Sequence, residues 1–274
     1  RGRFLARVEG PRGGNVLLRR AQHRRADDPP QALAIARAIV AAKTANQRTV
    51  LLRGLRDHGD KLAPDRRAEL ERSCARLADL ARIALHAPDI DTARGREGEA
   101  AALYFAAFDA LILAEKPAFV FTTRSRRPPL DRINALLSFL YAMLGHDCRA
   151  ALESHGLDPQ IGFLHADRPG RAGLALDVME DLRPVLADRL ALSLVNRNQM
   201  KADDFLLEEA GAVRLTDDAR KRVLVAWQER KREEARHPFF NETAPIGLFA
   251  HLQAQLLARH LRGELDGYPA LIWK

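Results

Sequence analysis

The stretch GFLHADRPGRAGLALDVMED, residues 162–181, combines the end of a short extended connector with the first turns of a helix. The connector delivers His165, and the helix that begins near Leu174 carries Asp177 and Glu180. Residues three apart on a helix share a face, so both carboxylates project the same way. An imidazole beside two carboxylates suits Mg²⁺ or Mn²⁺ better than structural zinc, which prefers thiolate and imidazole ligands. The stretch therefore predicts a candidate metal site.

Two arginines in the same stretch indicate a phosphate ligand. Arg168 and Arg171 lie between His165 and the helix, and arginine beside a metal site can hold phosphate oxygens through paired hydrogen bonds. An ordinary interpretation also stands, because helices carry Asp and Glu on solvated faces and a single histidine is more often structural. We expect Asp181, which lies close to the same helix face, at the surface.

Outward from this stretch, most segments show apolar residues at helical spacing, which predicts a mainly α fold with a helical catalytic domain rather than an α/β sheet. Cap residues and prolines mark several helix starts. The segment FLLEEAGAVRLT predicts a small hairpin with Gly211 in its turn. We expect helices over residues 28–55, 64–85, 95–111, 131–156, 174–196 with a kink at Pro184, 216–236 and 245–261.

The composition is that of a globular protein with a polyanionic partner. The 274 residues are 47% hydrophobic and 29% charged, and the formal net charge is +8. Such an excess favours DNA, RNA or an acidic membrane. Residues 1–30 hold eight arginines against three acidic residues, although a solvated face explains that run equally well. Only Cys74 and Cys148 are present, so we expect two buried free thiols rather than disulfides or a thiolate zinc site.

One long apolar segment and the start of the chain predict where the protein is located in the cell and whether a domain is missing. AAALYFAAFDALILAEKPAFVF is interrupted by Asp109, Glu115 and Lys116, so it predicts a core helix rather than a membrane span. No signal peptide is visible, and we expect a cytoplasmic protein. The opening RGRFLARVEG has a short β-like pattern from Phe4 and Leu5. We expect it to be the cut end of a domain whose N-terminal part is missing.

A further carboxylate, Glu97, stands in ARGREGEAA between Gly95 and Gly98, at a predicted helix start. Glycines there would let another backbone or a nucleic acid approach closely. Alternatively, an acidic residue in the first turn complements the helix dipole. The residues alone favour the second interpretation.

Three blocks of the sequence resemble, in order, the signature motifs of the CRISPR-associated "Cas one" family: ARGREGEAAALYF, NALLSFLYAMLGHDCRAALESHGLDPQIGFLHADRPGR and LALDVMEDLRP. The likeness extends from about Phe4 to the terminal YPALIWK and is greatest to the I-C-like branch. It implies a metal-dependent DNA endonuclease and integrase that inserts spacers by 3′-hydroxyl attack on a phosphodiester. It also implies that residues 1–28 are the remnant of an N-terminal β-rich domain and linker, and that residues 29–274 are the α-helical catalytic domain.

The resemblance implies a complete metal site as well. The family's ligands fall on Glu97, His165 and Glu180, and Asp177 matches a neighbouring acidic position that is thought to assist. The ion would be Mg²⁺ or Mn²⁺. The stretch 162–181 would then supply only part of the site, and an earlier helix would supply the rest.

Basic residues around these positions are the predicted DNA contacts. The resemblance places two of them, and the others adjoin the site or belong to the loop TTRSRRPP, which could equally be an ordinary solvated loop. We expect Tyr141 to be a core residue rather than a base-stacking one. The predicted DNA-binding residues are Arg94 and Arg168, by resemblance, with Arg171, Arg124, Arg126 and Arg127.

The implied partners are double-stranded DNA (protospacer and CRISPR repeat), a second copy of the chain in a homodimer, and a small "Cas two" protein, with no membrane. A missing β-rich domain would put the homodimer in question, because family dimers use that domain. Two other function classes remain open. A non-catalytic helical DNA-binding module would bind DNA in a salt-dependent way without a metal effect. A helical protein-interaction scaffold would have no DNA affinity near physiological salt.

Overall fold

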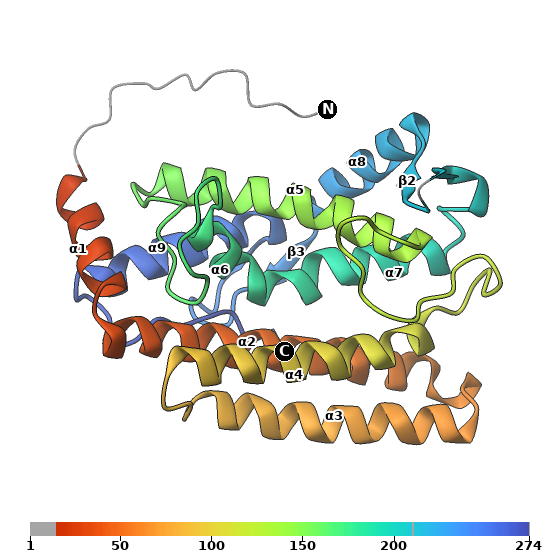
Figure 1. Ribbon diagram of the computed structural model, residues 1–274, viewed down its shortest axis with the longest axis horizontal. Helices are drawn as coiled ribbons and strands as arrows, with labels where there is room; N and C mark the ends of the chain where they lie inside the picture. Colours follow the sequence, from red (N-terminus) through yellow and green to blue (C-terminus); the bar gives the residue numbers. More distant parts are fainter. Residues whose placement is uncertain (1–14, 210, 274) are drawn as a thin grey trace.

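The computed structural model describes residues 15–209 and 211–273, which form the predicted mainly α fold (Figure 1). The β-like pattern predicted at Phe4 and Leu5 lies outside these residues. The α-helices are α1 (Val16–Ala26), α2 (Pro29–His58), α3 (Pro64–Ala84), α4 (Ile90–Phe108), α5 (Arg132–Ser154), α6 (Gly173–Leu182), α7 (Arg189–Asn196), α8 (Asp217–Arg232) and α9 (Phe249–Leu261). Short helical turns join them at η1 (Gly59–Lys61), η2 (Asp109–Leu111), η3 (Arg183–Asp188), η4 (Ala202–Asp204) and η5 (Ile246–Leu248).

Predicted cap residues begin two of the helices. The Asp28 carboxylate accepts from the Gln31 N–H at 3.2 Å at the start of α2, and the Thr216 hydroxyl accepts from the Ala219 N–H at 3.2 Å at the start of α8. Each contact satisfies a backbone donor that has no partner within the helix. These local signals explain why the starts of the two helices agree with the sequence prediction.

Other boundaries were wrong. α4 begins at Ile90 rather than near Gly95, because Asp89 caps it by accepting from the Thr92 N–H at 2.6 Å. Glu97 therefore lies well inside the helix, and the interpretation of it as a first-turn residue is wrong. The sequence did not predict α1, and α8 ends at Arg232, before a second hairpin.

The predicted kink at Pro184 is a stretch of π-helix. α6, η3 and α7 run continuously from Gly173 to Asn196, and η3 is the π-helical part. Proline has no N–H to donate and its ring crowds the preceding turn, so the backbone widens there.

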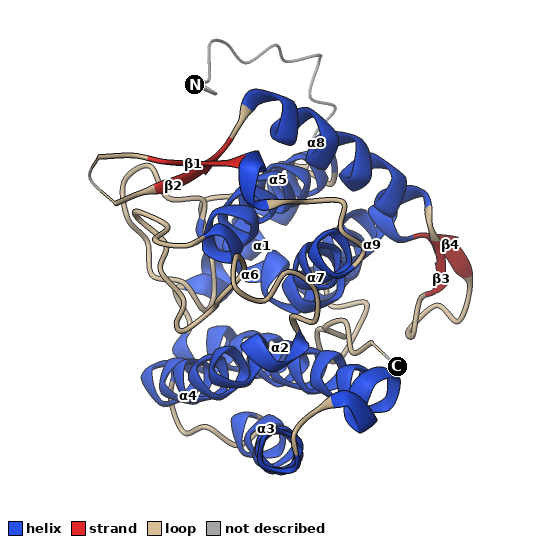
Figure 2. Ribbon diagram, turned by 90° about the vertical axis from the view of Figure 1, so that its right-hand side faces the viewer, coloured by secondary structure: helices blue, strands red, loops and turns tan. Residues whose placement is uncertain are grey.

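Two layers of helices enclose the core, with α2 between them. Figure 2 shows α3 and α4 on one side of α2, and α6, α7 and α9 on the other. α2 packs against α3, α4, α6 and η3, and its apolar side is buried, as at Ile39 and Leu51. Because α2 touches both layers, a polar side chain on it can reach residues from α4 and α6 together.

The strands are short and lie at the edge of the bundle. β1 (Phe205–Leu207) pairs antiparallel with β2 (Val213–Leu215), which confirms the predicted hairpin, and Gly211 has the positive φ of 78° that its turn needs. β3 (Glu234–Arg236) pairs with β4 (Thr243–Pro245) in a hairpin that was not predicted. Cys74 and Cys148 are buried free thiols, as expected. Among the described helices, none combines the length and apolar content that crossing a bilayer would require.

Candidate active site

The connector that carries His165 is held close to the bundle by tight packing and by α1. A Cβ added at Gly162 would lie 2.9 Å from both the Asp177 carboxylate and the Gly173 backbone, so only glycine fits there. The buried Gln22 of α1 donates to the carbonyls of Asp158 and Ile161 at 2.8 Å each. Both contacts fix the backbone that leads to His165.

Asp177 positions the imidazole. Its carboxylate accepts from the N–H groups of Phe163 at 2.6 Å, Leu164 at 3.0 Å and His165 at 3.0 Å. It also accepts from the His165 ring, whose Nδ1 lies 2.6 Å from Asp177 Oδ1. Nδ1 therefore carries a proton that Asp177 accepts, and Nε2 is the ring nitrogen that faces Glu180, whose Oε1 is 3.7 Å away. A carboxylate behind a histidine in this way fixes the tautomer of a metal-ligating imidazole.

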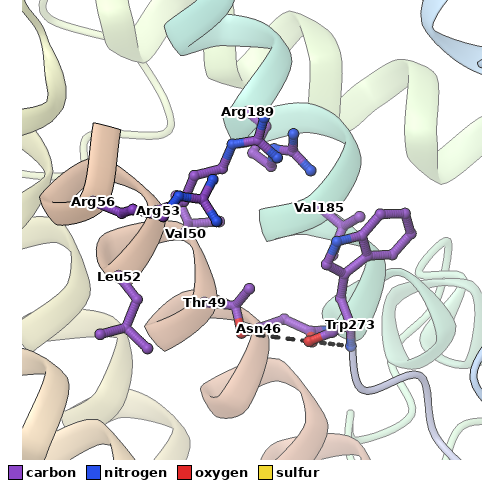
Figure 3. Close-up of a pocket in the computed structure, with 9 residues that line it drawn as sticks. All are labelled: Asn46, Thr49, Val50, Leu52, Arg53, Arg56, Val185, Arg189 and Trp273. Atoms are coloured by element: carbon purple, nitrogen blue, oxygen red, sulfur yellow. Dashed lines mark hydrogen bonds between the residues drawn. The ribbon is translucent and has the colours of Figure 1, made fainter. Parts of the chain in front are cut away.

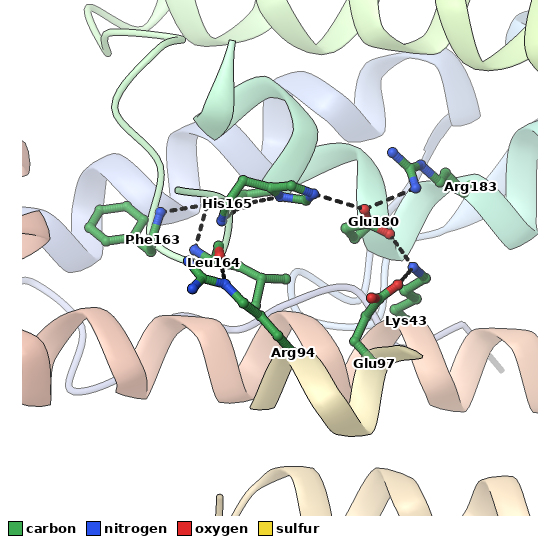
Figure 4. Close-up of polar contacts among 9 residues, drawn as sticks. Lys43, Arg94, Glu97, Phe163, Leu164, His165, Glu180 and Arg183 are labelled. Carbon is green, nitrogen blue, oxygen red and sulfur yellow. Dashed lines mark hydrogen bonds and ion pairs between the residues drawn. The ribbon is translucent and has the colours of Figure 1, made fainter. Parts of the chain in front are cut away.

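Glu180 is a buried carboxylate surrounded by positive charge (Figure 4). Its side chain is 2% exposed, Arg183 Nη1 is 2.9 Å from Oε1, and Lys43 Nζ is 2.6 Å from Oε2. Burial alone would raise the pKa of Glu180, but Arg183, Lys43 and His165 outweigh it and lower that pKa to about 2. Glu180 is thus ionised at all ordinary pH values.

Lys43 joins the two acidic sides of the site, and the sequence analysis did not single it out. Its ammonium contacts both Glu97 of α4 and Glu180 of α6 (Figure 4). The Lys43 side chain is only 5% exposed, whereas that of Glu97 is 25% exposed. A lysine on the otherwise apolar face of α2, between Val40 and Gln47, was the available signal. It marks a buried cation, which needs an acidic partner.

The structure brings the predicted ligands into one place but does not draw them into a closed metal cluster. His165 and Glu180 approach each other directly, and Glu97 is joined to Glu180 through Lys43. Within residues 15–209 and 211–273, no three His, Cys, Asp or Glu side chains are grouped closely enough to hold an ion. The donors nevertheless fit a hard divalent cation, since they offer an imidazole lone pair and two carboxylates. A single positive charge, that of Lys43, already lies between those carboxylates.

Asp181 is not at the surface, as we expected from its sequence position. It is 1% exposed, because α6 is enclosed by α2, α5 and α9. Its Oδ2 accepts from the Leu271 N–H at 2.8 Å and so fixes the C-terminal segment. Burial raises the pKa of Asp181 to about 8, against the effect of the hydrogen bond from Leu271. Asp181 therefore has a structural role.

The predicted DNA-binding arginines of the connector and of α4 behave differently. Arg94 Nε donates to the Leu164 carbonyl at 2.7 Å, and its Nη1 is 2.9 Å from Asp91. Arg94 therefore supports the connector beside His165. Arg168 is exposed and Arg171 is partly exposed, at a turn on the outer side of the connector.

The loop arginines are also not equivalent. Arg124 donates to Asn134 Oδ1 at 2.6 Å and to Ser138 Oγ at 3.0 Å, so it is tied to α5. Arg126 and Arg127 are exposed. Of these three arginines, Arg126 and Arg127 remain available to a ligand.

A second buried polar group adjoins the site. Asp188 accepts from the hydroxyls of Tyr141 at 2.6 Å and Tyr104 at 2.9 Å. Burial raises the pKa of Asp188 to about 6, although both tyrosine hydrogen bonds act in the opposite direction. Tyr141 packs against the core, as expected, while its ring faces Arg183 and Arg124, 5.1 Å and 5.3 Å from the ring centroid.

Comparison with known proteins shows the family of this chain. The model of the family "CRISPR associated protein Cas1" matches residues 1–229. The chain belongs to the Cas1 family. It is 58% identical over 274 residues to "CRISPR-associated endonuclease Cas1 2" of Rhodospirillum rubrum, which covers 100% of this chain and 79% of the relative. A Chlorobaculum tepidum relative, also named a Cas1 endonuclease, is 52% identical over 273 residues and covers 100% of this chain and 79% of its own length.

Solved Cas1 structures share the fold. A CAS1 protein from Thermotoga maritima has a TM-score of 0.75 and 26% identity, covering 90% of this chain and 70% of that one. A chain of a Cas6-RT-Cas1–Cas2 complex has a TM-score of 0.80 and 29% identity, covering 100% of this chain and 28% of that one. The recognition of this Cas1 chain from its three sequence blocks is confirmed.

Proposed function

We propose that this Cas1 protein is a metal-dependent DNA endonuclease and integrase of CRISPR adaptation. It inserts spacer DNA into the CRISPR array by attack of a 3′-hydroxyl on a phosphodiester, and water replaces that hydroxyl in cleavage. The observation that carries the proposal is the line Asp177–His165–Glu180, an imidazole oriented by one carboxylate toward a second, which Lys43 links to the third carboxylate, Glu97. The endonuclease names of the relatives support it.

Glu97, His165 and Glu180 would hold Mg²⁺ or Mn²⁺. When bound, such an ion supplies Lewis-acid stabilisation of charge on the phosphate and favours ionisation of the attacking hydroxyl. Asp177 keeps the imidazole in the tautomer that presents the Nε2 lone pair. In this proposal the three residues act as ligands rather than general bases; for Glu180 this agrees with the neighbouring Arg183 and Lys43, which lower its pKa and keep its carboxylate ionised.

Basic residues orient the DNA in this proposal. Arg183 and Lys43 contact Glu180 directly, so they are the nearest donors for phosphate oxygens at the reacting centre. Arg168, Arg126 and Arg127 are exposed and would continue the contacts along the DNA backbone. The contribution of Arg94 is indirect, through the connector carbonyl that it holds.

The proposed partners are double-stranded DNA, a second copy of the chain and a Cas2 protein. The structural neighbours from Cas1–Cas2 complexes support the Cas2 partner. The DNA substrate and the homodimer follow from the family resemblance.

Single alanine substitutions test the site. Glu97→Ala, His165→Ala and Glu180→Ala should each abolish Mg²⁺- or Mn²⁺-dependent cleavage and strand transfer on a labelled repeat duplex, with the helical circular dichroism signal retained. Glu99→Ala is the matched control, because Glu99 lies on the same helix and pairs with Arg76 and Arg96 at the surface. Its activity should be unchanged.

Wild-type activity in any one of the three ligand variants would contradict the site assignment. DNA binding that depends on salt but never on metal, with no cleavage by the unmodified protein, would support the non-catalytic module instead.

A further inference from the structure

A cleft lined by arginines lies on another side of α2. It consists of two adjoining cavities of about 230 Å³ and about 640 Å³, which share Val50, Arg53 and Arg189 in their walls. Six basic residues face two acidic ones, a formal excess of four positive charges. The charged lining residues are Arg53, Arg56, Lys61, Arg189, Arg197 and Arg230, with Asp57 and Glu233.

The two acidic residues of this arginine cleft already form ion pairs with other arginines, and neither pairs with Arg189. Arg53 and Arg56 lie 3.3 Å and 2.9 Å from Asp57, and Arg230 contacts Glu233. None of the described residues hydrogen-bonds or ion-pairs with the Arg189 guanidinium.

The surroundings of Arg189 disfavour the positive charge of its guanidinium. Burial, together with the charges of Arg230 and Arg53, lowers the pKa of Arg189 to about 10. The buried Nε of Arg230 and the buried Nδ1 of His58, both in the lining residues, also have no hydrogen-bond partner in the described structure. An anion in the cleft would relieve the repulsion and satisfy donors at the same time.

An aromatic ring completes the wall opposite the arginines. Figure 3 shows Arg53, Arg56 and Arg189 around one space, with the indole of Trp273 across it. The Trp273 backbone is fixed, since its N–H donates to Asn46 Oδ1 at 2.7 Å, while its ring is only partly buried. Arginines that can bind phosphate, beside a fixed aromatic ring on which a base can stack, are the two components of a single-strand nucleic-acid site.

This cleft is distinct from the carboxylate site. Lys43 and Gln47 share one face of α2, and Lys43 reaches the carboxylates from there. The two cavities of the cleft share no lining residue with the small cavity that Lys43 and Gln47 line. One nucleic acid would therefore contact the two regions at separate places.

We propose that the arginine cleft binds a single-stranded nucleic-acid segment, with its phosphates on Arg189, Arg53 and Arg230 and one base stacked on Trp273. The inference rests on the proposed DNA substrate of this protein but not on its metal site. A duplex is excluded from this mode because its bases are stacked on one another and cannot stack on the indole.

Intrinsic fluorescence tests the proposal in EDTA at low salt, with a ten-residue oligothymidylate as the probe. Trp227 is 1% exposed and gives a constant background, so quenching should report Trp273. Arg189→Gln should weaken binding about tenfold or more. The matched control is Arg72→Gln, an exposed arginine of α3 without a described partner, which should weaken binding less than about twofold.

A second variant covers the case in which Arg189→Gln fails to fold. Trp273→Phe keeps an aromatic ring and should retain most binding by fluorescence anisotropy, whereas Trp273→Ala should lose about tenfold. Equal losses in the Arg189 and Arg72 variants, equal quenching of the Trp273 fluorescence by a duplex of the same length, or competition by inorganic phosphate at the probe's own concentration would each overturn the proposal. Quenching without any metal-dependent cleavage would support the cleft and refute the first site; cleavage without quenching would do the reverse.

Discussion

The carboxylate site and the arginine cleft both use side chains of α2 and differ in how charge is balanced. In the carboxylate site each buried carboxylate meets a cation, and Lys43 lies between Glu97 and Glu180. In the cleft, positive charges lie together, and Arg189 has no hydrogen-bond or ion-pair partner within residues 15–209 and 211–273. The first region must exchange a cation of its own to bind another, whereas the second is already prepared for an anion. The two ligands that we propose match this difference: a metal ion for the carboxylate site and a nucleic-acid strand for the arginine cleft.

The largest expected effect tests the charge balance of the carboxylate site. Lys43→Met should lower the free energy of unfolding by about 3–5 kcal/mol in metal-free buffer, because it removes the cation that Glu97 and the buried Glu180 share and leaves only Arg183 to pair with Glu180. Added Mn²⁺ should restore part of the loss. Urea unfolding with and without Mn²⁺ measures both.

The control is Lys221→Met, which removes an exposed lysine paired with Asp218 at 3.1 Å. It should change the free energy of unfolding by less than about 0.5 kcal/mol. If Lys43→Met were as stable as the wild type without metal, the charge balance described here would be wrong.

Asp177 tests whether the imidazole must be oriented. Asp177→Asn presents an amide donor to His165 Nδ1, which favours the wrong tautomer, so Mn²⁺ affinity should fall by about 10–100-fold. Asp167→Asn is the control, because Asp167 is exposed in the same connector. Mn²⁺ affinity unchanged in the Asp177 variant would show that the tautomer is immaterial.

The pH dependence of stability tests the buried acid between the two regions. Asp188 faces Tyr104, Tyr141, Arg183 and Arg124, and its folded-state pKa of about 6 lies above the ordinary value. The folded protein therefore keeps a proton that the unfolded chain has lost. The contribution of Asp188 to the free energy of unfolding should fall as pH rises from about 4 to about 6, by at most about 1.4 kcal/mol per pH unit, and Asp181, whose pKa is raised to about 8, adds a fall of its own over the same range.

Asp188→Asn cannot titrate and should make this part of the profile shallower in urea unfolding, while the slope from Asp181 remains. An unchanged slope would assign the dependence to another group.

The smallest expected effect is on stability and concerns the arginine cleft. Arg189→Met keeps the apolar stem and removes the repulsion with Arg53 and Arg230, so the free energy of unfolding should rise by about 0.5 kcal/mol at low salt and less at high salt. Thermal unfolding at two salt concentrations measures this change in stability. A loss of stability instead would mean that Arg189 has a stabilising partner in solution.

Local signals predicted the fold well, and long-range contacts explain what was missed. Asp28 and Thr216 cap their helices through residues three positions away, so their effect can be inferred from neighbouring sequence. Asp89 does the same for α4 but was overlooked, which displaced the expected helix start. The burial of Asp181 depends on Leu271, 90 residues away, and no local pattern reports it.

The residues of the carboxylate site also divide into those that local sequence predicts and those that it does not. His165, Asp177 and Glu180 are close in sequence and could be grouped from spacing, whereas Glu97 entered only through the family resemblance. Lys43 was missed because the partner that explains its burial lies on α6, far along the chain. The arginine cleft was invisible for a similar reason, since Arg53 and Arg189 meet only after α2 and α7 pack together.

The central claim is that Glu97, His165 and Glu180 bind one divalent ion, and a Mn²⁺ titration tests it most directly. Calorimetry or electron paramagnetic resonance on the wild type, Glu97→Gln and Glu99→Gln would count the ions and measure their affinity. We predict one Mn²⁺ in the wild type and in Glu99→Gln, with binding at least about tenfold weaker in Glu97→Gln. No binding to the wild type, or equal binding to all three proteins, would contradict the account.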